Sequence, residues 1–282
     1  MIDYTDRGAR ERRLDTLLAS VDKIIAHAIR RGITEHRDGR GRGRTLAGTV
    51  TMFSGGNDST VLAHIMRTRT DYFGHANTGI GIEATREFVR KACADWGVPL
   101  LERTPLPGRR YEDYVLEHGF PGPGAHDRVY ARIKGSAFEQ INKELCPNPY
   151  RQRVLFVGGR RFTESARREG RRIPAWERRK SIVWVSPLRG WHALDLNTYR
   201  QRFPDCPTNE VAGDIGMSGE CLCGAFAKPD ELAMLRTYSP AATAVTEIDR
   251  LTAAALAAGV PAGRCVWGRR PVDRPCGEGC NL

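Results

Sequence analysis

Long hydrophobic runs are missing from this 282-residue sequence. No apolar stretch approaches the roughly 20 residues that a helix needs to cross a bilayer, which excludes a helical membrane protein. The first residues also lack the apolar core behind a basic start that marks a secretory signal peptide. We therefore expect a cytoplasmic protein that does not insert into a membrane.

Acidic residues are in the minority. The sequence has 33 Asp and Glu against 44 Lys and Arg, which gives a net charge of +11. Such an excess favours an anionic partner, namely a nucleotide, a phosphate or a nucleic acid, and does not distinguish among them. Hydrophobic residues make up 40% of the chain, enough for a sizeable core, which excludes global disorder.

The chain has no internal repeat, and its one biased segment is the Gly- and Arg-rich stretch 34–47, which we expect to be a basic linker. Before it, residues 9–32 carry apolar side chains at three- and four-residue steps and predict an amphipathic helix. We expect this helix to pack on the main domain, and a contact in a homodimer is the alternative.

After the linker, β-rich runs alternate with helical patterns. The strands are expected near residues 48–53, 71–80, 98–106 and 153–159, and the helices near 58–69, 83–97 and 127–145. This alternation predicts an α/β fold with a parallel twisted sheet and helices on both faces. Ligands of such sheets bind beyond the carboxyl ends of the strands.

The stretch SGGNDS, residues 54–59, joins the first strand to its helix. A strand, a Gly-rich turn and a helix N-terminus make an anion site, because free backbone N–H groups and the helix dipole favour negative charge. Gly55 and Gly56 let the backbone approach a phosphate closely. The hydroxyl donors beside them are Ser54, Ser59 and Thr60. Although the stretch lacks the spacings of the Walker loop and of dinucleotide folds, it predicts phosphate binding, with a plain strand–turn–helix as the alternative.

Four segments in order resemble the phosphoadenosine phosphosulfate (PAPS) reductase family of the PP-loop ATP pyrophosphatases. SGGNDS resembles the S-G-G-x-D-S signature of that superfamily, and SPLRGWHALDL (186–196) resembles the family's P-L-x-x-W segment. HANTGIGIEATREFV resembles the D-T-G…E-T-x-x-F-V segment at Asn77, Thr78, Gly79 and Thr85. LFVGGRRFTESARR resembles the G-x-R-x-x-E-S-x-x-R segment at Gly159, Arg161, Glu164, Ser165 and Arg168.

The resemblance implies an adenine nucleotide α-hydrolase-like, Rossmann-like fold whose signature loop cradles the phosphates of ATP, with Mg²⁺, or of a related adenylate. The residues that it implies for nucleotide contact are Ser54, Gly55, Gly56, Asn57, Asp58, Ser59, Thr60, Asn77, Thr78, Gly79, Arg160 and Arg161. Asp58, Arg161 and Arg168 are implied to be catalytic, with both arginines facing the anionic reactant. A carboxylate beside a phosphate is unfavourable unless it caps the helix or helps to hold Mg²⁺.

Two departures from the family bear on the reaction. The signature Asp58 is intact, whereas PAPS reductases commonly lose it, and the chain ends in PCGEGCNL instead of their E-C-G-[LI]-H segment. These departures favour adenylation of an acceptor with pyrophosphate release, coupled to sulfur transfer, as in relatives that thiolate nucleic acids. A nucleic acid or a sulfur-donor protein would then be a partner. The alternatives are a PAPS or adenylylsulfate reductase that uses a C-terminal Cys, and a non-catalytic nucleic-acid-binding protein.

Two pairs of cysteines suggest a metal site. Cys221 and Cys223 lie in SGECLCG, and Cys276 and Cys280 lie in PCGEGCNL. Four thiolates suit Zn²⁺ or a 4Fe–4S cluster, and the family resemblance favours iron–sulfur. Unligated thiols or a C-terminal redox disulfide are the alternative, and Cys206 and Cys265 are substitute ligands.

The motifs divide the chain into four expected regions. These are an N-terminal helical extension (1–33), the linker (34–47), a nucleotide-binding core (48–200) and a Cys-rich, metal-binding C-terminal region (201–282).

Other polar residues near these motifs allow more than one role. Lys134 matches a position where the family often carries a Lys, so a phosphate contact and a surface lysine are both open. His75 ends the second predicted strand and is expected to be structural. Arg178, Arg179 and Lys180 flank Trp176 on a predicted polar connection, which suits either a polyanion surface or a solvated face.

Overall fold

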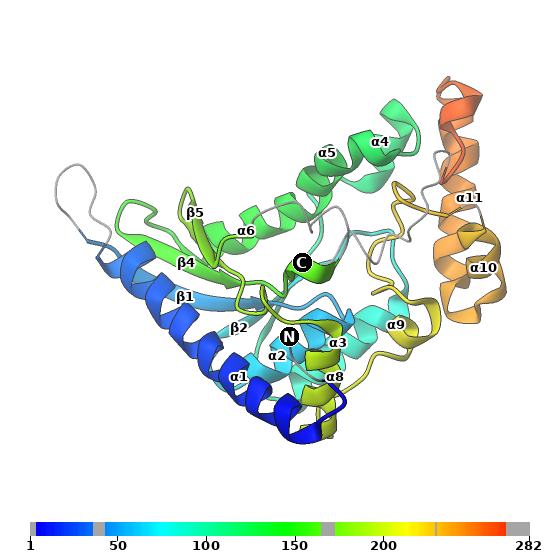
Figure 1. Cartoon of the computed structure of the whole chain (residues 1–282). Coiled ribbons are helices and arrows are strands. Elements are labelled where there is room, and N and C mark those ends of the chain that lie inside the picture. Colours follow the sequence, from blue (N-terminus) through cyan, green and yellow to red (C-terminus); the bar gives the residue numbers. More distant parts are fainter. Residues whose placement is uncertain (1–3, 36–42, 165–172, 229, 269–282) are drawn as a thin grey trace.

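The computed structural model describes residues 4–35, 43–164, 173–228 and 230–268. Its centre is a six-stranded sheet in the order β3-β2-β1-β4-β6-β5 (Figure 1). The strands are β1 (Thr45–Met52), β2 (Tyr72–Ala76), β3 (Leu100–Arg103), β4 (Gln152–Val157), β5 (Trp176–Arg179) and β6 (Ile182–Val185). All neighbouring strands run parallel except β5 and β6. The predicted α/β fold is thereby confirmed.

Helices connect the strands. They are α1 (Arg7–Ile29), α2 (Asn57–Met66), α3 (Glu83–Asp95), α4 (Tyr111–His118), α5 (His126–Tyr130), α6 (Ser136–Leu145), α8 (Ala193–Arg202), α9 (Glu210–Ile215), α10 (Glu231–Thr237) and α11 (Ala242–Ala257). Two π turns extend them: η1 (Arg30–Thr34) follows α1, and η3 (Ala131–Gly135) lies between α5 and α6. Within the described ranges, no helix has both the length and the apolar character needed to cross a bilayer.

Both faces of the sheet are covered, as a parallel sheet requires. One face packs against α1, α2 and α8 through a cluster that includes Leu14, Val21, Val61, Leu155, Val183, Trp191 and Leu196. The other face packs against α6 through Val50, Met52, Phe138, Ile141, Val154, Phe156 and Trp184. The strands can be buried on both sides because their central residues are apolar. The residues of α1 in the first cluster confirm the predicted packing of the N-terminal helix on the main domain.

Strand β5 corrects the prediction of a polar connection around Trp176. It pairs antiparallel with β6, with Arg178 opposite Val183 and Arg179 opposite Ile182. Charged side chains suit an edge strand because they discourage pairing with another chain. Three of its four residues are charged, so this short strand lacks the alternating apolar pattern that identifies strands in a sequence. Strand β1 likewise begins at Thr45, inside the predicted linker.

The segment after α9 builds a second core with α4, α10 and α11. Its buried members include Val115, Leu222, Leu235, Ile248, Leu251 and Trp267. Two backbone hydrogen bonds join this part to the segment after β2: Leu222 N donates to the Ile80 carbonyl (2.7 Å), and Ile82 N donates to the Gly219 carbonyl (2.8 Å). The cysteine-bearing segment is therefore held against the carboxyl edge of the sheet.

Helix α1 is attached to α8 by an ion pair that generates a stability prediction. Arg13 donates to both oxygens of the buried Asp195 (2.7 and 2.9 Å), and Asp195 also accepts from the backbone N–H of His192. We expect Asp195→Ala to lower the free energy of unfolding by about 2 kcal/mol, because it leaves the half-buried Arg13 guanidinium without its carboxylate and the His192 N–H without its cap.

Urea unfolding would measure this change. The matched control is Arg12→Ala on the same helix, because Arg12 pairs with Asp6 at the surface. That variant should cost less than about 1 kcal/mol. Equal losses in the two variants would contradict a stabilising role for the Arg13–Asp195 pair.

Candidate nucleotide site

The predicted phosphate loop connects β1 to α2 at the carboxyl edge of the sheet. Gly55 has a φ of +76°, and a Cβ there would lie 2.7 Å from the Thr85 side chain, so only glycine fits. Gly56 is the N-cap of α2 and provides no side-chain cap, which leaves the first amides of the helix to an incoming anion. The hydroxyls of Ser59 and Thr60 both donate to the Gly56 carbonyl, and these bonds fix the turn from inside.

Asp58 and Arg161 form a buried ion pair beneath this loop. Arg161 Nε and Nη2 donate to the two carboxylate oxygens of Asp58 at 2.5 and 3.0 Å, and both residues are less than 10% exposed. A planar fork of this kind is the strong geometry for an Arg–carboxylate pair. The backbone of Gly159 lies so close that a Cβ there would be 3.4 Å from Asp58. The loops after β1 and β4 are thus joined.

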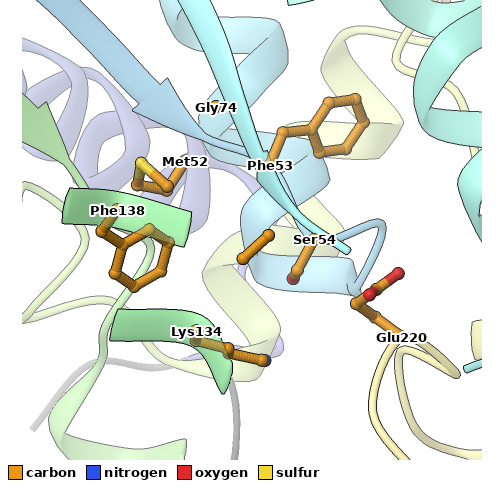
Figure 2. A pocket seen from close by; sticks show the side chains of 8 residues that line it. Met52, Phe53, Ser54, Gly74, Lys134, Phe138 and Glu220 are labelled. Atoms are coloured by element: carbon orange, nitrogen blue, oxygen red, sulfur yellow. The ribbon is translucent and has the colours of Figure 1, made fainter. Parts of the chain in front are cut away.

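Beside the loop is a hollow with an empty volume of about 260 Å³, part of which is open solvent. Figure 2 shows Ser54, Lys134 and Glu220 entering it from three separate segments of the chain. Its apolar walls are Met52, Phe53, Gly74, Ala76 and Phe138. The surface role considered for Lys134 is wrong, because its side chain is 4% exposed on the π turn η3. A buried ammonium in such a hollow favours a negatively charged ligand.

A second buried ion pair lies behind the hollow. His75 Nδ1 donates to the Phe53 carbonyl (2.7 Å), and His75 Nε2 lies 3.0 Å from Glu220 Oε2. Glu220 Oε1 also accepts from the backbone N–H of Thr78 (2.9 Å). The structural role predicted for His75 agrees with these contacts, whereas Glu220 was missed, although it directly precedes Cys221.

Each member of this pair shifts the pKa of the other. Burial acts to lower the pKa of His75, but the Glu220 carboxylate outweighs burial and holds that pKa above its usual value. Burial acts to raise the pKa of Glu220, but His75 and then Arg86 hold it below its usual range. Each charge of the pair therefore favours the charged form of the other.

The remaining predicted nucleotide contacts are distributed around the site. Thr78 is buried and its hydroxyl donates to the Glu220 carbonyl, whereas Gly79 is exposed with a φ of +78°. The side chain of Asn77 donates to Glu102 (2.8 Å), and exposed Asn57 accepts from Arg200 (3.0 Å).

Of the predicted arginines, only Arg161 is shown beside the loop. Arg160 turns toward β5, where it donates to Ser186 (3.0 Å) and pairs with Glu177 (3.1 Å). Arg168 lies outside the described residues. Asn209 was not predicted, yet it is buried and donates to the Gly55 carbonyl (2.9 Å). Its place before α9, as the N-cap, is the signal that could have indicated its importance.

The structure describes half of the predicted metal site. Cys221 and Cys223 are buried and line a second hollow of about 220 Å³ together with His126 and Lys134. Cys276 and Cys280 lie outside the described residues. In the part of the chain that the structure describes, no three His, Cys, Asp or Glu side chains are grouped to hold a metal.

The two substitute ligands lie in different cores. Cys206 belongs to the core against α8, apart from the cluster that holds Cys221 and Cys223, and burial raises the pKa of its thiol to about 11. Cys265 lies in the same cluster as that pair, where its thiol donates to the Val260 carbonyl.

The His75–Glu220 pair generates a pH-dependent prediction. At about pH 6, Glu220→Gln should lower the free energy of unfolding by about 3 kcal/mol, because the buried imidazolium loses its counter-charge. A raised pKa in the folded state contributes stability that is present below about pH 6.5 and is lost as the pH rises through the folded value. The gap between wild type and variant should therefore narrow with rising pH.

Urea unfolding at a series of pH values from about 6 upward would measure this difference in the free energy of unfolding between wild type and variant. Asp249→Asn is the control: Arg236 lowers the pKa of Asp249 and stays charged across this range, so the difference between wild type and this variant should stay constant. A Glu220→Gln gap that is equally constant would show that His75 does not titrate against Glu220.

Comparison with known proteins places this geometry in a family. Residues 48–210 match the model of the phosphoadenosine phosphosulfate reductase domain. No curated protein matches the sequence.

Two solved structures illustrate the similarity. The PAPS reductase from Candida auris, in a phosphate complex, is 19% identical over 72% of this chain and 91% of that chain, with a TM-score of 0.46. The U34-tRNA thiolase NcsA from Methanococcus maripaludis, with its 4Fe-4S cluster, is 14% identical over 86% of this chain and 80% of that chain, with a TM-score of 0.38. Since the matched domain covers more than half of the sequence and contains the loop, Asp58 and Arg161, the chain belongs to the phosphoadenosine phosphosulfate reductase domain family.

Proposed function

We propose that this chain binds ATP or a related adenine nucleotide at residues 54–59 and transfers the adenylate to an acceptor, with release of pyrophosphate. The observation that carries the proposal is the intact signature loop, whose helix N-terminus opens at the carboxyl edge beside Lys134. Helix amides and a buried ammonium both favour phosphate groups. Asp58 and Arg161 hold the loop in this shape before the nucleotide binds.

The proposed reaction is a displacement at the α-phosphorus. A lone pair of the acceptor oxygen forms the new P–O bond, and the bond to the bridging oxygen breaks, so that its electron pair leaves with pyrophosphate. The protein contributes by positioning the reactants and neutralising charge. Mg²⁺ supplies neutralisation of the phosphate oxygens, and Asp58 is the loop carboxylate that would hold it. Both oxygens of Asp58 now accept from Arg161, so Arg161 would have to turn toward the nucleotide first.

We further propose that the adenylated acceptor, a nucleic acid, receives sulfide-level sulfur from a donor at the carbon that bears the adenylate, whose C–O bond breaks so that AMP leaves. Lys134 lines both the nucleotide hollow and the hollow of Cys221 and Cys223, so a thiol and an activated acceptor can meet there. With Cys276 and Cys280, this pair would hold a 4Fe–4S cluster, or Zn²⁺ in its place. A cluster supplies iron that binds sulfur ligands.

Reduction of a sulfonucleotide is the second candidate. The match to a reductase domain favours it. In that reaction a C-terminal cysteine thiolate would attack the sulfur of the nucleotide, the S–O bond to the phosphate would break, and the nucleotide would leave. An external thiol would then supply the two electrons that release sulfite from the S-sulfocysteine.

The first test separates the two candidates. Purified protein is incubated with Mg²⁺-ATP and RNA as the acceptor, or with PAPS and an added thiol reductant, and pyrophosphate and sulfite are measured. We expect pyrophosphate from ATP, and Asp58→Asn should reduce its release at least about a hundredfold, because the metal ligand is lost. An exposed carboxylate outside the site provides the control: Asp95→Asn, which removes the charge that pairs with Lys91 at the end of α3, should stay within about threefold of wild type. Sulfite from PAPS, without pyrophosphate from ATP, would replace the adenylation proposal with reduction.

The second test concerns the metal. Anaerobically purified protein should be brown and contain about four iron atoms per chain. Cys223→Ser should lose the iron, whereas Cys93→Ser, on the buried face of α3, should retain it. Zinc in place of iron would identify the alternative metal, and metal-free protein would contradict the site.

A further inference from the structure

Three arginines gather at the edge of the sheet where the parallel strands β1, β4 and β6 begin, away from the candidate nucleotide site. Arg44 directly precedes β1, Arg153 is the second residue of β4, and Arg178 lies in β5. Figure 1 shows these strand ends near the end of α1, on the side of the sheet away from the carboxyl edge. The three residues come from separate segments and are brought together by the sheet.

The strand register places the three side chains on one face. Leu46 pairs with Arg153, and Arg44 precedes Leu46 by two residues, so both arginines share the face that α1 covers. Arg178 pairs with Val183, which pairs in turn with Leu155, two residues after Arg153. The same alternation therefore sends Arg178 to that face as well.

Two of these guanidinium groups, those of Arg44 and Arg153, have buried nitrogens without an acceptor among the described residues. Arg153 is only 7% exposed, and while one of its terminal nitrogens donates to the Lys180 carbonyl, its Nε has no acceptor among the described residues. Arg44 Nε and Nη1 are also buried and also have no acceptor among the described residues. Buried charged donors are costly to leave unmatched.

The cluster also has no carboxylate to balance it within the described chain. Burial lowers the pKa of Arg153, and the charges of Arg44 and Arg178 lower it further. The nearest carboxylate in sequence, Glu177, pairs with Arg160 and Arg179 on the opposite face of β5. Glu35, at the end of η1, pairs with Arg30 and Arg31.

We propose that Arg44, Arg153 and Arg178 form a second anion site, which takes a phosphate group. Guanidinium forks match phosphate oxygens in pairs, and a bound phosphate would both satisfy the free donors and offset the repulsion among the three charges. Free phosphate and the backbone of a nucleic acid share this chemistry. The site is separate from the loop at residues 54–59, so it stands whether or not adenylation takes place there.

The chain provides a matched pair of variants for the test. Arg178→Ala and Arg179→Ala remove the same charge from adjacent exposed positions of one strand, but only Arg178 faces the cluster. In phosphate-free buffer, Arg178→Ala should unfold at the wild-type temperature or above it, because repulsion is relieved. Inorganic phosphate should then stabilise wild type and Arg179→Ala more than Arg178→Ala. The loop at residues 54–59 is unchanged in both variants, so the difference between them reports the second site.

The nucleic-acid arm uses a short fluorescent single-stranded RNA and measures anisotropy at several salt concentrations. If the phosphate belongs to a nucleic acid, Arg178→Ala should weaken RNA binding about tenfold. It should also reduce the slope of log affinity against log salt concentration by about one, while Arg179→Ala stays near wild type. A difference between the variants with inorganic phosphate alone identifies free phosphate as the ligand. Equal behaviour of the two variants in both arms would overturn the proposal.

Discussion

The buried ion pair between Asp58 and Arg161 is the interaction on which the candidate site depends. It joins the loop after β1 to the loop after β4, two segments that are 103 residues apart. Removal of either partner would leave a buried charge alone, which costs about 3–5 kcal/mol in comparable pairs. The pair therefore fixes the shape of the phosphate loop in the absence of a nucleotide. It also keeps a cation directly beneath a place where negative charge is expected.

A second buried pair repeats this arrangement one strand away. His75 connects the backbone just before the loop to Glu220, and Glu220 directly precedes Cys221. There is no room for a side chain at residue 81, because a Cβ on Gly81 would lie 2.3 Å from the Glu220 carbonyl oxygen. The position of the cysteine segment is thus set by the strands that carry the phosphate loop. The loop at residues 54–59 and the segment of Cys221 and Cys223 lie at one edge of the sheet for this reason.

The two edges of the sheet differ in whether a buried positive side chain has a carboxylate partner among the described residues. At the carboxyl edge, Arg161 and His75 each have a carboxylate partner, so the site is preorganised and close to neutral. At the amino edge, Arg153 has arginine neighbours instead. Preorganised neutral networks suit a ligand that brings its own counter-ion, whereas unbalanced arginines suit a bare phosphate.

The sequence by itself determined the alternation of strands and helices, the phosphate loop, and the edge at which that loop opens. Local signals were sufficient there, because hydrophobic periodicity and glycine positions act over a few residues. Only the tertiary structure decided that β5 is a strand, that Lys134 is buried, and that Asp58 forms an ion pair with Arg161. It also supplied Glu220 and Asn209 as partners of the site. Each of these features depends on a contact or on burial produced by residues distant in sequence, and such relations leave no periodic trace in the residues concerned.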